Sequence, residues 1–186
     1  MAGVLGAGAG GRVYRAISSG RHYAAHPGVE LVGVVDARPE RAETAAAHGA
    51  PFFIDHRDLI GRVDAVSIAV PTSLHHAVAA DFLDAGIAIL VEKPVTDDVA
   101  TASDLVRRAE ARGLVFNVGH IERFSPVFQA LAAEIEAPAL IECQRHNPWS
   151  GRAIDVDVVL DLMIHDIDLA LALAASEVVE VEACGV

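Results

Sequence analysis

A chain of 186 residues that is 53% hydrophobic and 22% charged has the size and composition of a folded protein with one full core and part of a second. Its net charge of −12 argues against nucleic acid or an anionic membrane as a partner, because binding a polyphosphate surface needs a basic one. The sequence shows no apolar run of the roughly 18 residues that a membrane span needs, no secretory leader and no cysteine framework, so we expect a cytoplasmic protein.

Residues 1–119 alternate between strand-like and helix-like segments. Runs of apolar or β-branched residues predict strands at 3–6, 29–35, 63–70, 87–92 and 114–119. Ala-rich or amphipathic segments that end in glycine predict helices at 39–49, 72–86 and 97–113. Strands that are apolar throughout, each followed by a helix, are typical of a parallel sheet covered on both faces. We therefore predict a doubly wound α/β domain over residues 1–119.

The pattern changes after Gly119. Segments 125–138 and 157–175 predict helices, and segments 139–146 and 177–186 predict strands. No low-complexity linker separates this part of the chain from the first domain. We expect residues 120–186 to form a second, partial α+β domain that directly abuts the first.

A glycine-rich loop follows the first predicted strand. The segment GAGAGG at 6–11 fits the pattern G-x-G-x-x-G through Gly6, Gly8 and Gly11, with Gly10 inside the same loop. In a dinucleotide-binding turn the first glycine makes the bend, the second admits the pyrophosphate and the third lets the helix pack on the strand. An ordinary structural turn also fits the pattern, but its place between a strand and a helix-compatible segment favours a nucleotide-binding domain of the Rossmann type.

An acidic residue, Asp36, ends the second predicted strand, 25 residues after Gly11. A carboxylate at this place accepts hydrogen bonds from the ribose hydroxyls of a dinucleotide and repels a 2′-phosphate. The sequence therefore favours NAD over NADP as the cofactor. Arg38, two residues further on, leaves some tolerance for NADP.

Three ionisable residues lie on one side of the apolar helix predicted at 157–175. Asp161, His165 and Asp168 are spaced i, i+4 and i+7, which at about 100° per residue places them in a stripe about 60° wide. Burying such a stripe without partners costs several kcal/mol, so we expect it to face a cleft or a polar ligand. A cap or a solvated helix edge is the simpler alternative. An Asp–His pair also suits a metal ion, but no HExxH motif or Cys cluster completes a ligand set, so we predict no metal site.

Lys93, in the segment LVEKPV at 90–95, is the only lysine among the 14 Lys and Arg residues. An arginine side chain does not release its proton in a protein, whereas a lysine ammonium acts as an acid or base. One lysine retained in an arginine-rich chain therefore indicates proton-linked chemistry at this position. A surface lysine without a role is the alternative.

Taken together, these segments resemble the Gfo/Idh/MocA family of NAD(P)-dependent sugar and cyclitol oxidoreductases. The resemblance rests on GAGAGG, Asp36, VPTSLHH (70–76), VEKPV (91–95) and DLMIHDIDL (161–169), in this order along the chain. It implies that Lys93 and His165 are the catalytic residues, with Asp161 as a third member. In that chemistry His165 takes the hydroxyl proton as a hydride leaves, Asp161 orients the ring, and Lys93 hydrogen-bonds the same oxygen.

The resemblance also implies contacts with the cofactor beyond the glycine loop and Asp36. Pro71, Thr72 and His75 would line the nicotinamide side, although His75 also suits a capping or packing role in its own helix. Glu92 would contact the cofactor ribose or order the loop that carries Lys93.

At the domain junction the resemblance implies contacts with the substrate. His120 and Arg123 would meet a sugar or a diphosphate, since the guanidinium fork of arginine suits phosphate. A structural salt bridge fits Arg123 equally well. Segments 118–126 and 155–169 are most similar to the branch of the family that oxidises the 3-hydroxyl of UDP-N-acetylglucosamine. Inositol or a free sugar is the alternative substrate, and a non-catalytic nucleotide-binding remnant is the alternative function.

The sequence departs from the family pattern in two places. Asp36 follows Gly11 by 25 residues where relatives have about 20, and Tyr14 stands where the family has His, so we expect the first helix to be interrupted near Gly20. The family's second domain is an open, mostly antiparallel sheet, of which residues 120–186 supply a part. An incomplete sheet leaves an apolar face and unpaired edges, so we expect a homo-oligomer formed through the substrate-domain sheet.

Overall fold

The computed structural model describes residues 2–7, 23, 27–47, 49–146 and 156–185. The chain divides into two compact units, residues 1–119 and 120–186. The expected interruption of the first helix near Gly20 lies outside the described residues. None of the described helices is long and apolar enough to cross a lipid bilayer.

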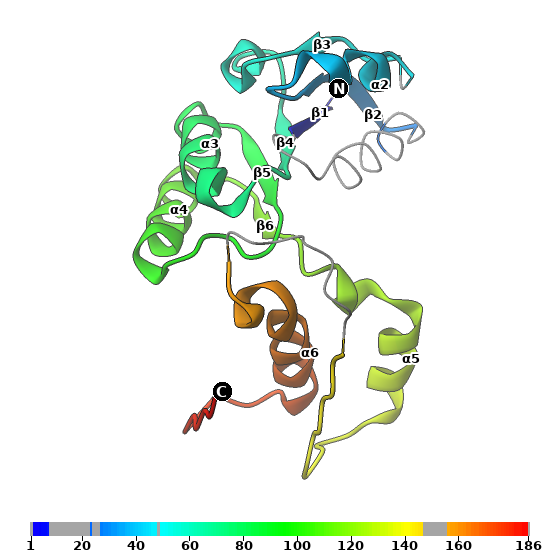
Figure 1. The fold of residues 1–186 in the computed structure, drawn as a ribbon, viewed down its shortest axis with the longest axis vertical. Coiled ribbons are helices and arrows are strands. Elements are labelled where there is room, and N and C mark those ends of the chain that lie inside the picture. The colour runs from blue at the N-terminus through cyan, green and yellow to red at the C-terminus, as the bar shows by residue number, and fades with distance from the viewer. Residues whose placement is uncertain (1, 8–22, 24–26, 48, 147–155, 186) are drawn as a thin grey trace. The chain divides into compact units, whose positions relative to one another are not determined.

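The first unit is built on a six-stranded sheet in which every neighbouring pair of strands is parallel. The strands are β1 (Ala2–Ala7), β2 (Val29–Val35), β3 (Phe52–Phe53), β4 (Ala65–Ile68), β5 (Ala88–Val91) and β6 (Phe116–Val118). Their order is β3-β2-β1-β4-β5-β6, so the sheet grows outward in both directions from β1 and β4 (Figure 1). The predicted doubly wound α/β domain is confirmed, and doubly wound sheets bind ligands at the carboxyl ends of their strands, where the strand order reverses.

Helices follow these strands as the sequence pattern predicts. α3 (Thr72–Asp84) joins β4 to β5, α4 (Val99–Arg112) joins β5 to β6, and a turn at Pro39–Arg41 leads from β2 into the short α2 (Ala42–Ala46). The Asp98 carboxylate accepts a hydrogen bond from the backbone N–H of Thr101 at 2.9 Å and so caps the start of α4. Gly113, with φ of 63°, ends α4 in the left-handed conformation that glycine adopts without strain.

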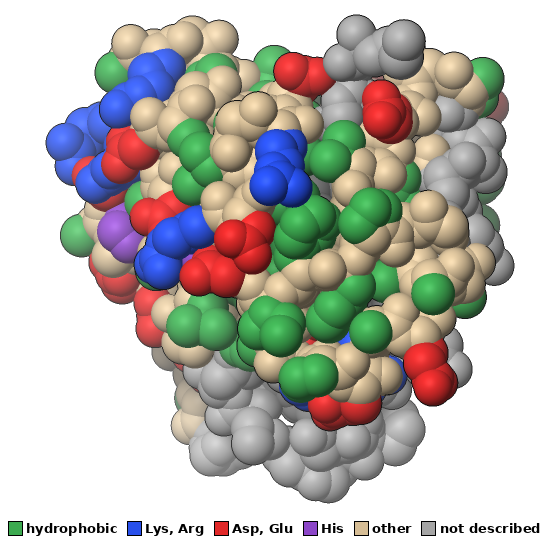
Figure 2. Space-filling view, turned by 90° about the horizontal axis from the view of Figure 1, so that it is seen from above, with side chains coloured by type: hydrophobic (Ala, Val, Ile, Leu, Met, Phe, Trp, Pro, Cys, Tyr) green, Lys and Arg blue, Asp and Glu red, His purple; other side chains and the backbone are tan. Residues whose placement is uncertain are grey.

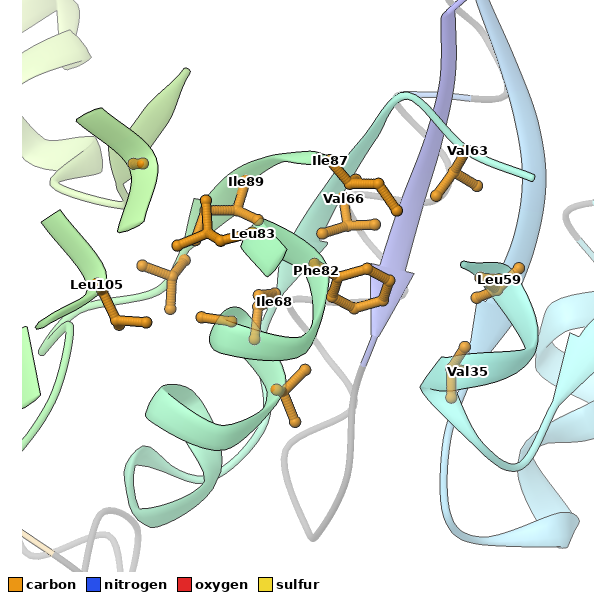
Figure 3. Close-up of a cluster of buried hydrophobic side chains, with 14 residues drawn as sticks. Val35, Leu59, Val63, Val66, Ile68, Phe82, Leu83, Ile87, Ile89 and Leu105 are labelled. Carbon is orange, nitrogen blue, oxygen red and sulfur yellow. The ribbon is translucent and has the colours of Figure 1, made fainter. Parts of the chain in front are cut away.

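The core of the first unit lies between α3, α4 and one face of the sheet (Figure 3). Phe82 and Leu83 of α3 and Leu105 of α4 are fully buried, and they pack with the inward-facing side chains of β4 and β5. Full burial of a large apolar side chain contributes about 1.5–3 kcal/mol. The cluster therefore fixes β4 and β5, and with them the first residues of the loops that follow these strands.

The second unit is helical in its described part. A 3-10 turn, Ile121–Phe124, precedes α5 (Pro126–Glu134). A π-helical turn, Val159–Met163, leads into α6 (Ile164–Ala174). The long helix predicted at 157–175 is therefore formed with a wider first turn, and the helix predicted at 125–138 is formed over a shorter length.

The two strands predicted in the second unit are not formed. Residues 139–146 and 177–185 have no regular secondary structure, and no strand occurs in the described part of this unit. A strand is stabilised by hydrogen bonds to a neighbouring strand, and within the described residues these two segments do not pair with one another. The described part of the second unit thus lacks the sheet through which we expected an oligomer to form.

Candidate functional site

Asp36 follows β2 at the carboxyl edge of the sheet and is 5% exposed. Its Oδ1 accepts hydrogen bonds from the backbone N–H and Nε of Arg38 at 2.9 and 3.0 Å, and its Oδ2 accepts one from Nη2 at 3.0 Å. The side-chain hydrogen bond to Asp36 raises the pKa of Arg38 above its ordinary value, against the opposing effect of burial. Arg38 therefore holds the carboxylate in one orientation.

The carboxylate of Asp36 fits the ribose of a dinucleotide. A carboxylate offers about four lone-pair sites, of which three are taken by Arg38, so among the described residues about one on Oδ2 is left for a ribose hydroxyl. Gly6, the first glycine of the loop, lies in β1 between Val34 and Ser67 of the neighbouring strands. Gly8, Gly10 and Gly11, which would cradle the pyrophosphate, lie outside the described residues.

Two further predicted segments reach the same edge of the sheet. Pro71 and Thr72 follow β4, and Glu92 and Lys93 follow β5. Because β4, β5 and β2 run parallel within one sheet, the residues that follow them lie along the same edge as Asp36. This is the edge at which doubly wound sheets bind their ligands.

The loop that carries Lys93 is held at several points. The backbone N–H of Glu92 donates to the Ile68 carbonyl at 2.9 Å. Pro94 and Thr96 are buried, and the Thr96 hydroxyl donates to the Asp98 carbonyl at 2.7 Å. Lys93 itself is half-buried, and its peptide bond to Pro94 is cis.

Glu92 packs against Gly119 at the end of β6. A Cβ atom at position 119 would stand 3.1 Å from Oε2 and 3.3 Å from Cα of Glu92, which leaves little room for any other residue. The Gly119 N–H donates to the Val91 carbonyl at 2.7 Å. These contacts favour the loop-ordering role that the sequence left open for Glu92.

His75, in the first turn of α3, is 1% exposed. Its Nδ1 lies 2.8 Å from the carbonyl oxygen of Pro94, and its Nε2 lies 3.0 Å from the carbonyl oxygen of Val70. The ring therefore occupies the packing position that the sequence left open as the alternative to a contact with nicotinamide.

In the second unit, α6 buries two of the three residues of the predicted polar stripe. His165 is 6% exposed and Asp168 is 9% exposed, so a solvated helix edge does not describe them. Asp161 is half-buried and lies in the π-helical turn, which has more residues per turn than an α-helix. The spacing predicted at 100° per residue therefore holds from His165 to Asp168 and not from Asp161.

Arg123 neutralises the buried charge of Asp168. Its Nε and Nη2 donate to Oδ2 and Oδ1 of Asp168, both at 2.7 Å, in the bidentate geometry that suits a carboxylate. The same hydrogen bonds raise the pKa of Arg123 above its ordinary value. Nδ1 of His120 lies 3.6 Å from Oδ1 of Asp168. Arg123 therefore forms the salt bridge that the sequence left open as one of its two roles.

A second ion pair, which the sequence analysis missed, ties residues 139–146 to α6. Nε and Nη2 of Arg145 donate to Oδ2 and Oδ1 of Asp166 at 2.9 and 2.8 Å. The hydrogen bond from Arg145 lowers the pKa of Asp166 below its ordinary value, against the opposing effect of burial. The partners are 21 positions apart, so no local spacing signals the pair.

The described residues contain no group of three or more His, Cys, Asp or Glu placed to hold a metal ion.

Comparison with known proteins adds the following. Residues 1–120 match a family described as oxidoreductases with an NAD-binding Rossmann fold. The chain is 44% identical to UDP-N-acetylglucosamine 3-dehydrogenase of Acidithiobacillus ferrooxidans, over 99% of this chain and 57% of that protein. It is 32% identical to an inositol 2-dehydrogenase of Corynebacterium glutamicum, over 97% of this chain and 56% of that protein.

Solved structures agree with these relatives. The structure of the A. ferrooxidans UDP-N-acetylglucosamine 3-dehydrogenase matches with a TM-score of 0.84 at 41% identity, over 97% of this chain and 59% of that one. GenD2 from gentamicin A biosynthesis, solved in complex with NAD, matches with a TM-score of 0.77 at 26% identity, over 92% of this chain and 53% of that one. The chain therefore spans a little over half the length of each of these proteins.

Proposed function

Because the chain belongs to the Gfo/Idh/MocA family of oxidoreductases, we propose that it acts in the NAD-dependent oxidation of the 3-hydroxyl of UDP-N-acetylglucosamine to a ketone. The observation that carries the substrate is the 44% identity to a UDP-N-acetylglucosamine 3-dehydrogenase, which extends over 99% of this chain and so over both of its units. The 32% identity to an inositol 2-dehydrogenase makes inositol the second candidate substrate.

The proposed chemistry assigns one task to each of three side chains. His165 takes the proton of the substrate hydroxyl, and Asp161 orients its ring and stabilises the imidazolium. Lys93 donates a hydrogen bond to the same oxygen as the carbonyl forms. NAD⁺ supplies the hydride acceptor. Lys93 belongs to the first unit and His165 to the second.

The cofactor would be held along the carboxyl edge of the sheet. Asp36 accepts a ribose hydroxyl, the loop from Gly6 to Gly11 holds the pyrophosphate, and Pro71 and Thr72 line the nicotinamide. The buried carboxylate at Asp36 supports NAD over NADP, because it would repel a 2′-phosphate.

The substrate contact in the second unit is proposed for His120 rather than for Arg123. Two of the Arg123 nitrogens already donate to Asp168 at 2.7 Å, whereas Nδ1 of His120 makes no hydrogen bond within the described part of the chain. An imidazole nitrogen can exchange a hydrogen bond with a sugar hydroxyl, as donor or as acceptor.

We also propose a cytoplasmic location and a homo-oligomeric state. Cys143 and Cys184 are exposed free thiols, which suits a reducing compartment. Large apolar side chains are exposed along α5, which supports self-association through this helix in place of the sheet that we expected.

Absorbance of NADH tests the proposed function directly. The full chain is incubated with NAD⁺ and, in parallel, with UDP-N-acetylglucosamine, myo-inositol and free N-acetylglucosamine. We expect NADH to form with UDP-N-acetylglucosamine and to form much more slowly, or not at all, with the other two. Faster turnover of inositol or of the free sugar would contradict the substrate assignment. Binding of NADH without turnover of any of the three would instead favour a non-catalytic nucleotide-binding role.

A further inference from the structure

We propose that His75 is a positioning residue for Lys93: by holding the Pro94 carbonyl, its ring fixes the backbone from which the lysine side chain projects. This role rests on the proposed function of Lys93 in proton-linked chemistry and adds a residue to it. It also replaces the contact with nicotinamide that the sequence led us to expect for His75.

The ring joins two loops that both reach the ligand-binding edge of the sheet. Val70 belongs to the loop after β4 and Pro94 to the loop after β5, and these strands are neighbours in the sheet. His75 contacts both carbonyl oxygens, at 3.0 and 2.8 Å. Pro94 is bonded directly to Lys93, so a shift of the Pro94 carbonyl moves the lysine backbone with it.

Both contacts draw on the N–H donors of one ring. A carbonyl oxygen accepts hydrogen bonds and never donates one, so the ring satisfies both oxygens at once only when both of its nitrogens carry a proton. A ring that donates at one nitrogen still holds one of the two loops. At 1% exposure, His75 cannot exchange either carbonyl for water without opening the core.

The anchor behind the ring is rigid. His75 lies one turn before Val78 and Ala79 and two turns before Phe82, which form the buried face of α3 in the hydrophobic core. A side chain on such a face cannot follow a loop that moves. The contact with Pro94 therefore ties the residue next to Lys93 to the hydrophobic core. Lys93 itself is half-buried and closer to solvent.

A single NMR signal reports on this position without any need for turnover. Because Lys93 is the only lysine in the chain, the full protein labelled with [¹⁵N]lysine gives one backbone amide signal. We expect His75→Leu to shift this signal and to increase the mobility of the amide, whereas His76→Leu, one residue along the same helix, leaves both unchanged. An unaltered Lys93 signal in His75→Leu would overturn the proposal.

Two conservative variants separate the two hydrogen bonds of the ring. In His75→Asn the amide nitrogen stands where Nδ1 stands and can donate to Pro94, whereas in His75→Gln it stands near Nε2 and can donate to Val70. We expect Asn to restore the Lys93 signal more fully than Gln. Equal restoration, or better restoration by Gln, would contradict a role through Pro94. If His75→Leu does not fold, this comparison decides alone.

Kinetics then distinguish positioning from cofactor binding. With UDP-N-acetylglucosamine and NAD⁺, His75→Leu should lower kcat about tenfold or more, since a misplacement of about 1 Å in a catalytic group costs on the order of 10²-fold. The Kd for NADH should stay within about threefold. A raised Kd with unchanged kcat would assign the ring to the cofactor and overturn the proposal. If the wild-type chain turns over none of the sugars, the proposed function fails, while the Lys93 signal still decides on the positioning.

Discussion

At position 93 the proposed chemistry depends on a property that arginine lacks. A lysine and an arginine both carry a positive charge, but only the lysine ammonium exchanges its proton within the range of enzyme catalysis. We therefore expect Lys93→Arg to lower kcat by about 10²-fold or more, the usual contribution of a positioned acid or base. The Kd for NADH should remain within about threefold of the wild-type value. Stopped-flow NADH absorbance and fluorescence titration measure the two quantities.

A matched exchange elsewhere controls for the change of side-chain type. Arg107 lies on the exposed side of α4, 73% exposed, so Arg107→Lys should leave kcat unchanged. Turnover by Lys93→Arg at the wild-type rate would show that charge alone suffices, and a proton-linked role would then be wrong.

Asp36 and Arg38 together decide between the two forms of the cofactor. Removing a hydrogen bond to a charged group costs about 1.5–3 kcal/mol, so Asp36→Ala should weaken the binding of NADH about 10- to 100-fold. The same change releases the Arg38 guanidinium, which in the wild-type chain donates two hydrogen bonds to Asp36, and a free guanidinium suits a 2′-phosphate. The Kd for NADPH should therefore fall relative to that for NADH.

The double variant Asp36→Ala/Arg38→Ala isolates the contribution of the guanidinium. It should bind NADH as weakly as the single variant and should lose the relative gain for NADPH. Unchanged NADH affinity in Asp36→Ala would exclude this carboxylate from the ribose site. Fluorescence titration with each reduced nucleotide gives all the constants.

At the scale of elements, α3 and α4 are tied by charged side chains as well as by their apolar faces. The Asp104 carboxylate of α4 accepts hydrogen bonds from Arg108 at 2.7 Å and from His76 of α3 at 3.0 Å. Arg108 also pairs with Asp84 at the end of α3. Figure 2 shows basic side chains lying among acidic ones on one side of the molecule. This mixing reduces the local repulsion between acidic side chains in a chain whose net charge is −12.

This link gives the first unit a specific dependence on acid. The hydrogen bonds from Arg108 and then from His76 lower the pKa of Asp104 below its ordinary value. A carboxylate with a lowered pKa in the folded state contributes stability above its unfolded pKa of about 3.9, and this contribution is lost as the pH falls through the folded pKa. The difference in urea midpoint between wild type and Asp104→Asn should therefore shrink between about pH 5 and about pH 3.

Asp97→Asn is the matched control, because Asp97 is an exposed acid just before α4. Its midpoint should differ from that of wild type by nearly the same amount at both pH values. A difference for Asp104→Asn that stays constant or grows in acid would contradict the link.

Local sequence patterns predicted the helices and strands that pack an apolar face into the hydrophobic core. β4, β5, α3 and α4 appear where apolar periodicity and glycine stops place them, because each buries its own apolar face in a single cluster. The two-residue strand β3 carries too short a pattern to be detected. The strand predicted at 139–146 is not formed. Its β-branched and apolar residues favour an extended backbone, but they do not indicate which strand it would pair with.

In the candidate site, too, some residues could be placed from the local sequence and others only from the fold. Asp36, Thr72 and Lys93 could be placed at one edge because each follows a recognisable parallel strand. The pairs Arg123–Asp168 and Arg145–Asp166 join residues 45 and 21 positions apart, a distance at which sequence spacing carries no signal. The role of His75 was ambiguous for a related reason, because a histidine near a helix start contacts either a ligand or backbone, and the fold alone shows which carbonyl groups lie within reach.

At the scale of the whole molecule, we expect the exposed apolar side chains on α5 to determine whether the chain associates with itself. Val127 and Leu131 are 78% and 48% exposed, and their spacing of four places them on one face of α5, while Phe124, in the 3-10 turn that precedes this helix, is 74% exposed. An exposed apolar face of this kind is typical of a protein–protein contact. The double variant Val127→Glu/Leu131→Glu should therefore shift the molar mass in solution, measured by light scattering after size-exclusion chromatography, from an oligomer to a single chain.

Ala133→Glu provides the control, since residue 133 is exposed on the opposite side of α5 and adds the same kind of charge. It should leave the molar mass of the oligomer unchanged. Added salt should increase association of the wild-type chain, because a net charge of −12 on each copy opposes contact and salt screens this repulsion over about 10 Å at 0.1 M. A wild-type chain that stays monomeric at high salt, or an oligomer that survives the double variant, would exclude α5 as the contact surface.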